Sequence, residues 1–413
     1  MTEGFTDTAT VEPLPPVGDV PTRPAATPGE WVRLNLFSSV PNTILTLLFG
    51  GLIAVSAFFA LRFVFVSGRW EIVRVNLTNF MVGRFPRDEL YRPWVAIFIA
   101  AFIAGLAAGV QAGRGAPLRW RETLRRATPL LVLLVVVLAL SRTPLPAIMV
   151  VASFGVGFAG RFVGQRVPAT TRRWLPLIWI ATIVAVFVAF TGFGGVGWDN
   201  WGGLLLTLYL ALAGIVLSFP IGVLLALGRR SSFPAVRVVC VGYIEFIRGV
   251  PLITLLFMSI FALRLFLPDF IPAPGDVVRA IVAFVLFTAA YVAEIVRGGL
   301  QGVPRGQTEA AQALGMSPLR ITRLIVLPQA LRNVIPALVG QFISLFKDTS
   351  LVFIIGLLDL LSVAQTVNAQ PNFRGQGLQA ETLLFASFIF WAFCYSMSRA
   401  SQRLEERLGV GQR

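Results

Sequence analysis

Long apolar runs are the feature that most constrains this chain of 413 residues. A run of about 20 apolar residues is long enough to cross the hydrocarbon core of a bilayer as a helix. Such runs lie at 43–66, 93–112, 175–194, 203–228, 239–266, 276–297, 335–358 and 381–399, and at 127–163, which Ser141 to Pro144 divides into two. The sequence therefore predicts an all-α, polytopic integral membrane protein with about ten transmembrane helices, five in each half.

Composition narrows the chemistry that the chain can perform. Charged residues make up 13% of the chain, against roughly 25% in an ordinary soluble domain. The chain has no His, which removes the usual general base, the usual zinc ligand and a Ser-His-Asp triad. Cys240 and Cys394 form no motif and are more typical of small apolar packing residues than of a metal pair or a disulfide. We expect no catalytic residue, no metal site and no cofactor.

The net charge of +15 comes from basic residues that cluster between the apolar runs. This placement is explained by the positive-inside rule, so nucleic acid is not an expected partner. If ten spans alternate, the Arg-rich loops and both termini lie in the cytoplasm. The segment 67–92 is the exception, because it falls outside and yet carries five arginines. It predicts either an interfacial amphipathic segment on the outer surface or a wrong span count in the first half.

Three parts follow along the chain. Residues 1–42 are rich in Pro, Thr and acidic residues and show no cleavable signal peptide, so we expect a disordered cytoplasmic tail. Residues 43–198 form an N-terminal transmembrane extension, and residues 199–413 form a second five-span domain. The sequence contains no GxxxxGK[ST] phosphate-binding loop, so any ATP-derived energy must come from a partner chain.

One polar stretch separates two of the apolar runs. Residues 307–314 are good helix formers, and Gly315 follows them, where Gly ends a helix by accepting a positive φ. Ser317 is a strong N-cap residue and Pro318 is favoured at the first helical position, while Pro328 should interrupt or kink the second helix. The pattern predicts a compact helix–turn–helix in the cytoplasm. An ordinary loop packed on its own protein is an equal alternative, and a DNA-reading motif is a remote one.

Two features inside the apolar runs suggest a transport pathway. Lys347, the only Lys in the chain, and its neighbour Asp348 fall near the middle of a predicted span, where charges are costly. One interpretation is a buried polar network that fixes either the helix packing or a subunit interface. The other is a direct contact with a zwitterionic substrate. Gly249 and Pro251 should break another span near its middle. Broken helices often line transport pathways, although a simple proline kink is an equal alternative.

Two pairs of opposite charges lie three residues apart on predicted helices. Glu245 and Arg248 form one pair, and Glu294 and Arg297 form the other. Side chains at this spacing share a helix face and can form ion pairs. We expect both pairs to be structural rather than to bind substrate, and Glu245 and Arg248 stay candidates for the translocation path or an interface. Arg305 is spaced to pair weakly with residue 309.

The polar stretch also carries a resemblance. Its residues match, at every fixed position, the EAA signature of binding-protein-dependent ABC importer permeases: Glu309, Ala310, Ala311, Gly315, Ile325, Leu327 and Pro328. Four further stretches are similar to the polar amino acid subgroup of that family: Tyr243–Ile253, Tyr291–Ala311, Leu327–Leu338 and Leu345–Leu351. This resemblance covers residues 200–402. The first half, with VRVNLTNFMVGRFP in its outer loop, resembles the long-form permeases of general L-amino acid and glutamate/glutamine/aspartate/asparagine transporters.

The resemblance implies a division of labour between subunits. Residues 199–413 would be an ABC transmembrane type-1 permease domain that performs no covalent chemistry, and the EAA residues would dock on a dimer of separate ATP-binding subunits. The other implied partners are a second permease subunit (a heterodimer in the long-form relatives), a periplasmic amino acid-binding protein, membrane lipid and a polar L-amino acid. The expected location is the bacterial inner membrane. An ion-gradient-driven secondary amino acid transporter and a membrane scaffold remain the alternatives.

Overall fold

The computed structural model describes the chain except for residues 1–26, 114–119, 193, 198–199, 269–273 and 410–413. The described residues are almost entirely helical and contain no β-strand, only one isolated β-bridge. They divide into two compact units, one ending at Gly68 and one beginning at Arg69. The expectation of an all-α protein is confirmed.

The first unit contains two helices and a π-helical turn: α1 (Pro28–Leu36), α2 (Val40–Arg62) and η1 (Phe63–Ser67). The predicted disordered tail reaches into α1, while its first 26 residues lie outside the described part of the chain. A helix forms there because Thr27 and Glu30 make a capping box, in which each side chain accepts a hydrogen bond from the other residue's backbone N–H. The composition of the tail did not reveal this local cap.

The second unit begins with the rest of the N-terminal extension. Its helices are α3 (Glu71–Val75), α4 (Leu77–Val82), α5 (Tyr91–Ala112), α6 (Trp120–Leu140), α7 (Leu145–Arg166), η2 (Ala169–Trp174) and α8 (Leu175–Thr191). Helices α5 and α7 pack backbone to backbone through glycines. A Cβ atom added to Gly160 would lie 2.2 Å from the carbonyl oxygen of Phe102, and one added to Gly109 would lie 2.2 Å from that of Arg161. Small residues of this kind let helices approach closely where no hydrophobic force drives them together.

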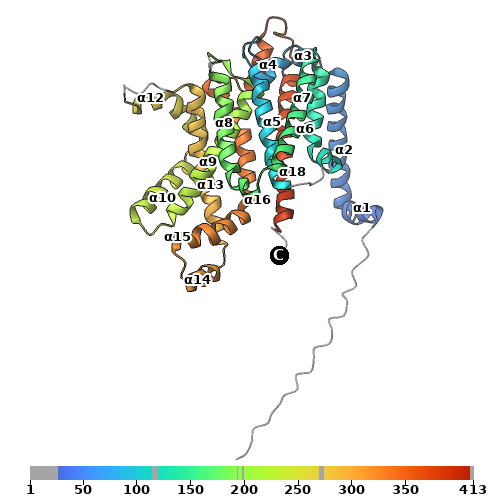
Figure 1. The fold of residues 1–413 in the computed structure, drawn as a ribbon. Coiled ribbons are helices and arrows are strands. Elements are labelled where there is room, and N and C mark those ends of the chain that lie inside the picture. The colour runs from blue at the N-terminus through green and yellow to red at the C-terminus, as the bar shows by residue number, and fades with distance from the viewer. Residues whose placement is uncertain (1–26, 114–119, 193, 198–199, 269–273, 410–413) are drawn as a thin grey trace, which may run out of the picture. The chain divides into compact units, whose positions relative to one another are not determined.

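The remaining helices of the second unit lie within residues 199–413, the range predicted as the permease domain (Figure 1). They are α9 (Gly203–Arg229), α10 (Pro234–Gly249), α11 (Leu252–Phe257), η4 (Met258–Ala262), α12 (Leu263–Phe266), α13 (Asp276–Gln301), α14 (Arg305–Ala313), α15 (Pro318–Ile321), η5 (Thr322–Val326), α16 (Leu327–Asp348), η6 (Thr349–Ile355), α17 (Leu360–Thr366), η7 (Val367–Ala369) and α18 (Gln379–Leu408). Within the second unit, α3, α4 and α17 lie at one end of the long helices, and α14 lies at the other end (Figure 1). We call these the α17 end and the α14 end.

Every predicted span corresponds to a helix. Among the described residues, eight helices are long and apolar enough to cross a membrane by themselves. A ninth span is possible if the pair Pro234–Gly249 and Leu252–Ala262, which is bent by 105°, crosses as one. The tenth predicted span corresponds to Thr128–Leu140, whose apolar part is shorter. The polytopic membrane architecture is confirmed, and the two weakest spans are the bent pair and α6.

In the second unit, residues 69–92 bury several large apolar side chains at the α17 end. Ile72, Phe80 and Phe85 are each at most 1% exposed, and the rings of Phe80 and Phe385 meet edge to face at 5.1 Å. An interfacial amphipathic helix would turn such side chains toward lipid. The expectation of an interfacial segment is therefore wrong, because tertiary packing buries the apolar face of α3 and α4 against α9, α17 and α18.

Internal contacts also account for several arginines of this segment. The guanidinium of Arg69 donates to the backbone carbonyl oxygen of Gln376 at 2.5 Å, and its backbone N–H donates to Glu381 of α18 at 3.0 Å. The guanidinium of Arg92 pairs with Glu89 at 2.5 Å and donates to the carbonyl oxygen of Ala189 at 2.9 Å. These arginines bind protein atoms, which explains why the segment departs from the charge pattern of the other loops.

Glycine contacts join α4, α9 and α17. The backbone N–H of Gly203 donates to the carbonyl oxygen of Leu358 at 2.7 Å, and Gly203 forms an isolated β-bridge with Asp359. Gly83 lies so close to Gly202 that an added Cβ atom would be 2.5 Å from the Cα of Gly202. The first helix of the 199–413 domain is thus fixed both to the extension and to α17.

Candidate functional site

The predicted helix–turn–helix is present at the α14 end. Helix α14 stops at Ala313, and Gly315 follows with a φ of 71°. The N–H of Met316 donates to the carbonyl oxygen of Ala311 at 3.2 Å, and the N–H of Gly315 donates to that of Gln312 at 2.9 Å. These two bonds form a Schellman motif, which needs a left-handed residue at the position of the glycine. The expected role of Gly315 in the turn is confirmed.

The second helix continues where a break was expected. Ser317 takes the extended N-cap conformation without a side-chain hydrogen bond, and Pro318 starts α15. Helices α15, η5 and α16 then run on as one candidate span, Pro318–Ile355. Pro328 lies in the first turn of α16, directly after the π-helical turn η5. The π-helical turn accommodates the missing N–H of the proline, so the helix does not end there.

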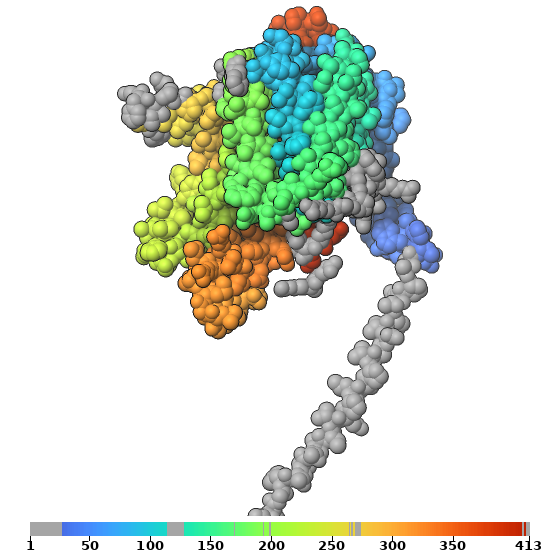
Figure 2. Space-filling view, in the orientation of Figure 1, coloured from blue at the N-terminus to red at the C-terminus, as the bar shows by residue number. Residues whose placement is uncertain are grey.

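Some of the signature residues of the polar stretch are exposed, and others pack on the chain itself. Glu309, Ala310 and Gly315 are exposed, whereas Ala311 is buried and packs α14 onto its own chain. Ile325 and Leu327 are half-buried and Pro328 is exposed on the following helix. In Figure 2 the orange surface of this region protrudes beyond the neighbouring helices. Arg305 and Glu309, spaced to pair, form no ion pair with each other in the structure.

Sequence reasoning missed two residues of this surface. Leu314 and Leu319, which flank the turn, are 81% and 78% exposed. Large apolar side chains grouped on a polar, protruding segment mark a protein interaction site. The signal was visible as leucines on either side of a Gly-Met-Ser-Pro turn, but their exposure depends on how α14 packs. The surface formed by Glu309, Ala310, Leu314, Gly315 and Leu319 is called the α14 surface below.

A network of charges lies behind the α14 surface and joins three helices. Glu294 of α13 pairs with Arg297 at 2.5 Å, with Arg229 of α9 at 3.5 Å and with Arg248 of α10 at 3.8 Å. Glu245 pairs with Arg229 at 2.9 Å. The predicted Glu294–Arg297 pair is confirmed. The predicted Glu245–Arg248 pair is wrong, because each of these side chains reaches a different neighbouring helix instead of its own helix face.

The predicted break in the seventh span is also present. Helix α10 ends at Gly249 and α11 begins at Leu252, with Pro251 at its N-cap and a bend of 105° between the two helices. The guanidinium of Arg248, one residue before the break, lies 5.7 Å from the centre of the Tyr291 ring. The break is a change of direction and not a simple kink.

Lys347 and Asp348 lie close to the end of α16. The Lys347 side chain is exposed on this chain, whereas Asp348 is half-buried and accepts a hydrogen bond from Ser344 at 3.5 Å. Over the described residues, Lys347 has no salt bridge. The structure does not join the two side chains to Glu245 or Arg248, so the four candidate residues form two separate groups.

The comparisons with known proteins agree with these features. The family described as binding-protein-dependent transport system inner membrane component matches residues 218–410. The chain is 38% identical over 401 residues to the inner membrane amino-acid ABC transporter permease protein YhdY of Escherichia coli strain K12. The aligned region covers 92% of this chain and 93% of that protein. The chain is 47% identical over 214 residues to the glutamate/glutamine/aspartate/asparagine transport system permease protein BztC of Rhodobacter capsulatus, over 51% of this chain and 48% of that one.

A chain from a solved structure, described as the crystal structure of an amino acid ABC transporter with histidines, is 33% identical with a TM-score of 0.44, over 50% of this chain and 92% of that chain. The similarity to the Escherichia coli permease extends through both the extension and the 199–413 domain. The chain therefore belongs to the family of binding-protein-dependent transport system inner membrane components, among the amino-acid ABC transporter permeases.

Proposed function

We propose that this chain is the permease subunit of an ATP-driven importer that carries polar L-amino acids across the bacterial inner membrane. Residues 199–413 form the translocating domain, and residues 43–198 form the N-terminal transmembrane extension, whose part from Arg69 onward packs on that domain. The chain itself hydrolyses nothing, because ATP is hydrolysed by a separate dimer of ATP-binding subunits. The names of the relatives, an amino-acid permease and a glutamate/glutamine/aspartate/asparagine permease, support the class of substrate.

The observation that carries this proposal is the α14 surface. No described element of the chain covers its exposed leucines, and the small side chain of Ala310 lets another protein approach the helix closely. The Schellman motif at Gly315 fixes the direction of α14 through backbone bonds. A rigid, protruding and partly apolar helix is suited to insertion into a groove of a partner protein. Glu309, Ala310, Ala311, Gly315, Ile325, Leu327 and Pro328 are the residues that we assign to coupling with the ATP-binding subunit.

The translocation path follows from two other features. The break between α10 and α11 leaves helix ends within an apolar region, where such ends commonly line a pathway. Lys347 is exposed on this chain although it lies in a candidate span, where an uncompensated charge facing lipid is costly. We assign Lys347 and Asp348 to the face that meets a second permease subunit or the substrate, and Glu245 and Arg248 to the helix pair beside it. A sister permease in a heterodimer would complete the cavity.

The cycle is an alternating-access movement between two arrangements of packed helices. ATP binding closes the ATP-binding dimer, and α14 transmits that movement to α13 and α16. In this proposed orientation, the α14 end and both termini face the cytoplasm throughout the cycle. The α17 end faces the periplasm, where a periplasmic amino acid-binding protein delivers the substrate.

Reconstitution tests this proposal. Full-length chain is placed in lipid vesicles with a candidate sister permease, candidate ATP-binding subunits and a candidate binding protein, and labelled amino acids are offered outside. We expect uptake of polar L-amino acids that requires internal ATP and both soluble partners. Uptake driven by an ion gradient in the absence of the ATP-binding subunits would establish a secondary transporter and refute the proposal.

A further inference from the structure

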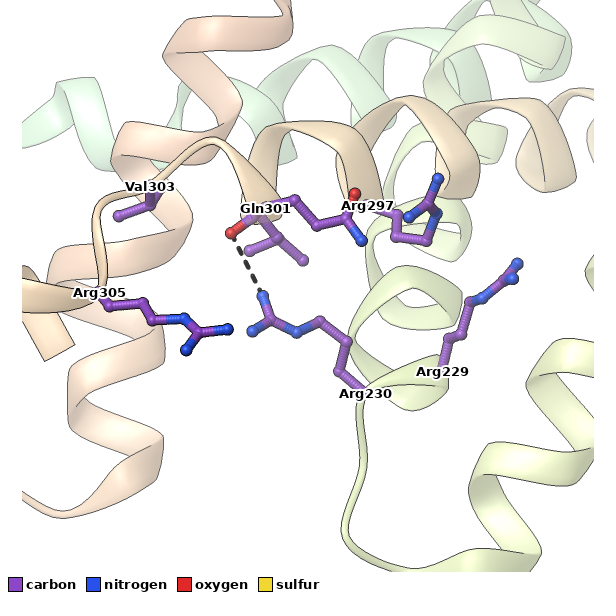
Figure 3. A pocket seen from close by; sticks show the side chains of 7 residues that line it. Arg229, Arg230, Arg297, Gln301, Val303 and Arg305 are labelled. Carbon is purple, nitrogen blue, oxygen red and sulfur yellow. Dashed lines mark hydrogen bonds between the residues drawn. The ribbon is translucent and has the colours of Figure 1, made fainter.

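A cavity lies beside the first turn of α14, between the ends of α9 and α13. Its volume is about 620 Å³, and Figure 3 shows the side chains that surround it. Four of the seven lining residues are arginines: Arg229, Arg230, Arg297 and Arg305. No carboxylate lines it. We call it the arginine cavity.

The four arginines differ in whether their charge is balanced. Arg229 and Arg297 pair with Glu294, and Arg229 also pairs with Glu245. Arg230 has no acidic partner among the described residues, and its guanidinium only donates to the carbonyl oxygen of Leu300 at 3.4 Å. Arg305 likewise has no acidic partner among the residues that the structure describes. The guanidinium groups of Arg230 and Arg305 extend toward one another from opposite sides of the cavity (Figure 3).

Two like charges that face each other across a cavity repel, and an anion between them removes that repulsion. The guanidinium group is planar and presents a fork of N–H donors that matches two oxygens of a phosphate at once. Both arginines are exposed, so an anion can reach them from outside the protein. The chain itself supplies no anion to this cavity among the residues that the structure describes.

The position of the cavity indicates where such an anion comes from. Arg229 is the last residue of the apolar helix α9, and Arg230 follows it directly. Gln301 is the last residue of the apolar helix α13. Both helices are candidate spans, so their ends lie at the depth of lipid headgroups. Basic pockets between the ends of transmembrane helices are suited to anionic headgroups. A phospholipid can therefore place its phosphate in the cavity while its chains stay along the helices.

We propose that the arginine cavity binds a phosphate group between Arg230 and Arg305. Arg229 and Arg297, held in place by Glu294, add to the positive potential behind it. The group belongs either to an anionic phospholipid or to a soluble phosphate compound, and both offer the same oxygens. Because Arg305 is the first residue of α14, a bound phosphate would tie the start of α14 to the end of α9. This proposal holds whether or not the α14 surface docks an ATP-binding subunit.

Native mass spectrometry of the full-length chain in detergent tests the proposal. The chain is titrated with phosphatidylglycerol, with a diacylglycerol that has the same acyl chains but no phosphate, and with inorganic pyrophosphate. The test variant is R230Q/R305Q, and the matched control is R320Q/R323Q, which removes two other exposed arginines at the same end of the molecule. Elution as a single species and an unchanged Tm show that each variant is folded.

We expect wild type and R320Q/R323Q to bind phosphatidylglycerol equally and to bind diacylglycerol far less. Each arginine near a lipid headgroup strengthens binding roughly fivefold, so R230Q/R305Q should bind about 25-fold more weakly. If pyrophosphate displaces the lipid only from chains that retain Arg230 and Arg305, the site accepts soluble phosphates as well. If pyrophosphate displaces no lipid from these chains, an anionic phospholipid is the source of the phosphate.

Three results would overturn the inference. The first is equal phosphatidylglycerol binding by R230Q/R305Q and R320Q/R323Q. The second is binding of diacylglycerol as strong as that of phosphatidylglycerol. The third is no binding of either phosphate compound to wild type, together with weaker association of the ATP-binding subunit in R230Q/R305Q alone. That last result would assign the cavity to a protein carboxylate at a subunit contact.

Discussion

The side-chain amides of Asn76 and Gln370 exchange two hydrogen bonds. Asn76 Nδ2 donates to Gln370 Oε1 at 3.1 Å, and Gln370 Nε2 donates to Asn76 Oδ1 at 2.7 Å. Asn76, which is 2% exposed, belongs to the N-terminal extension, and Gln370 follows α17 in the 199–413 domain. The extension is therefore joined to the 199–413 domain by a specific polar contact as well as by apolar packing.

Removing either amide should destabilise the joint between the two parts. Asn76→Ala and Gln370→Ala each leave a polar group unpaired, which costs about 1–3 kcal/mol when that group is buried. The double variant should cost less than the sum of the two single variants, because both partners are then gone. Thermal unfolding of the purified chain in detergent measures the three changes. Asn372→Ala, at an exposed position nearby, is the control, and strict additivity of the two single changes would show that the amides do not interact.

The φ of 71° at Gly315 gives a prediction about coupling. Gly315→Val should abolish transport-coupled ATP hydrolysis, because a β-branched residue is strongly disfavoured at positive φ and the turn would re-aim α14. An added Cβ atom meets nothing within 4 Å there, so any effect comes from the backbone and not from a clash. Gly315→Asn should keep most of the activity, since Asn tolerates the left-handed conformation.

The measurement for Gly315 is ATP hydrolysis stimulated by the binding protein in reconstituted vesicles. The amount of chain inserted in the membrane is determined in parallel and should be the same for wild type and both variants. Wild-type coupling in Gly315→Val would contradict the role of the turn, whereas equal loss in both variants would indicate a role for the glycine other than its φ.

Asp359 gives a prediction about pH. Its carboxylate caps α17 by accepting hydrogen bonds from the N–H groups of Leu361 and Ser362, each at 3.0 Å, and it is fully buried. Burial raises the pKa of Asp359 to about 7, although those hydrogen bonds act in the opposite direction. In the unfolded chain the pKa is about 3.9. Between these two values the folded state holds a proton that the unfolded state releases.

The contribution of Asp359 to stability is therefore greatest below about pH 4 and is lost as the pH rises through about 7. We expect the unfolding free energy of wild type to fall across this range by an amount on the order of 4 kcal/mol, and its Tm to fall with it. Asp359→Asn keeps the cap without a titrating group and should flatten the dependence, and Asp88→Asn, at an exposed position, should not. Parallel pH profiles for wild type and Asp359→Asn would rule out this assignment.

The contact between α5 and α7 predicts opposite effects for two glycines of one helix. A Cβ atom at Gly160 would meet the carbonyl oxygen of Phe102 at 2.2 Å, whereas one at Gly155 meets nothing within 4 Å. Gly160→Ala should cost about 1–3 kcal/mol through overpacking. Gly155→Ala should be neutral or stabilise by up to about 1 kcal/mol, because Ala favours the helix. Thermal unfolding of both variants tests this contrast, and equal Tm values would show that the helices are not in close contact at Gly160.

Features with a local cause could be predicted from the sequence. The turn at Gly315 and the break at Gly249 follow from the backbone preferences of glycine and proline, which act within a few residues. The Glu294–Arg297 pair follows from the spacing of a helix face. The spans were predicted from the length of the apolar runs alone, and α6, whose apolar part is short, is one of the two weakest of them.

Features with a distant cause could not be predicted. Asn76 and Gln370 meet although 294 positions separate them, and no spacing rule connects two such amides. Glu245 pairs with Arg229 of another helix, because the packing of α9 on α10 places that guanidinium within reach. The burial of Ile72 was hidden by the arginines around it, whose partners lie elsewhere in the chain.

Glu294 has a mechanical consequence for the helices that it joins. One carboxylate pairs with arginines from α9, α10 and α13, so sliding of α9 or α10 against α13 would break at least one of these ion pairs. Only residues 302–304 separate α13 from α14, which is too short a tether to absorb strain. If α14 moves, we therefore expect α13 to move with it, together with the ends of α9 and α10 that Glu294 joins to α13.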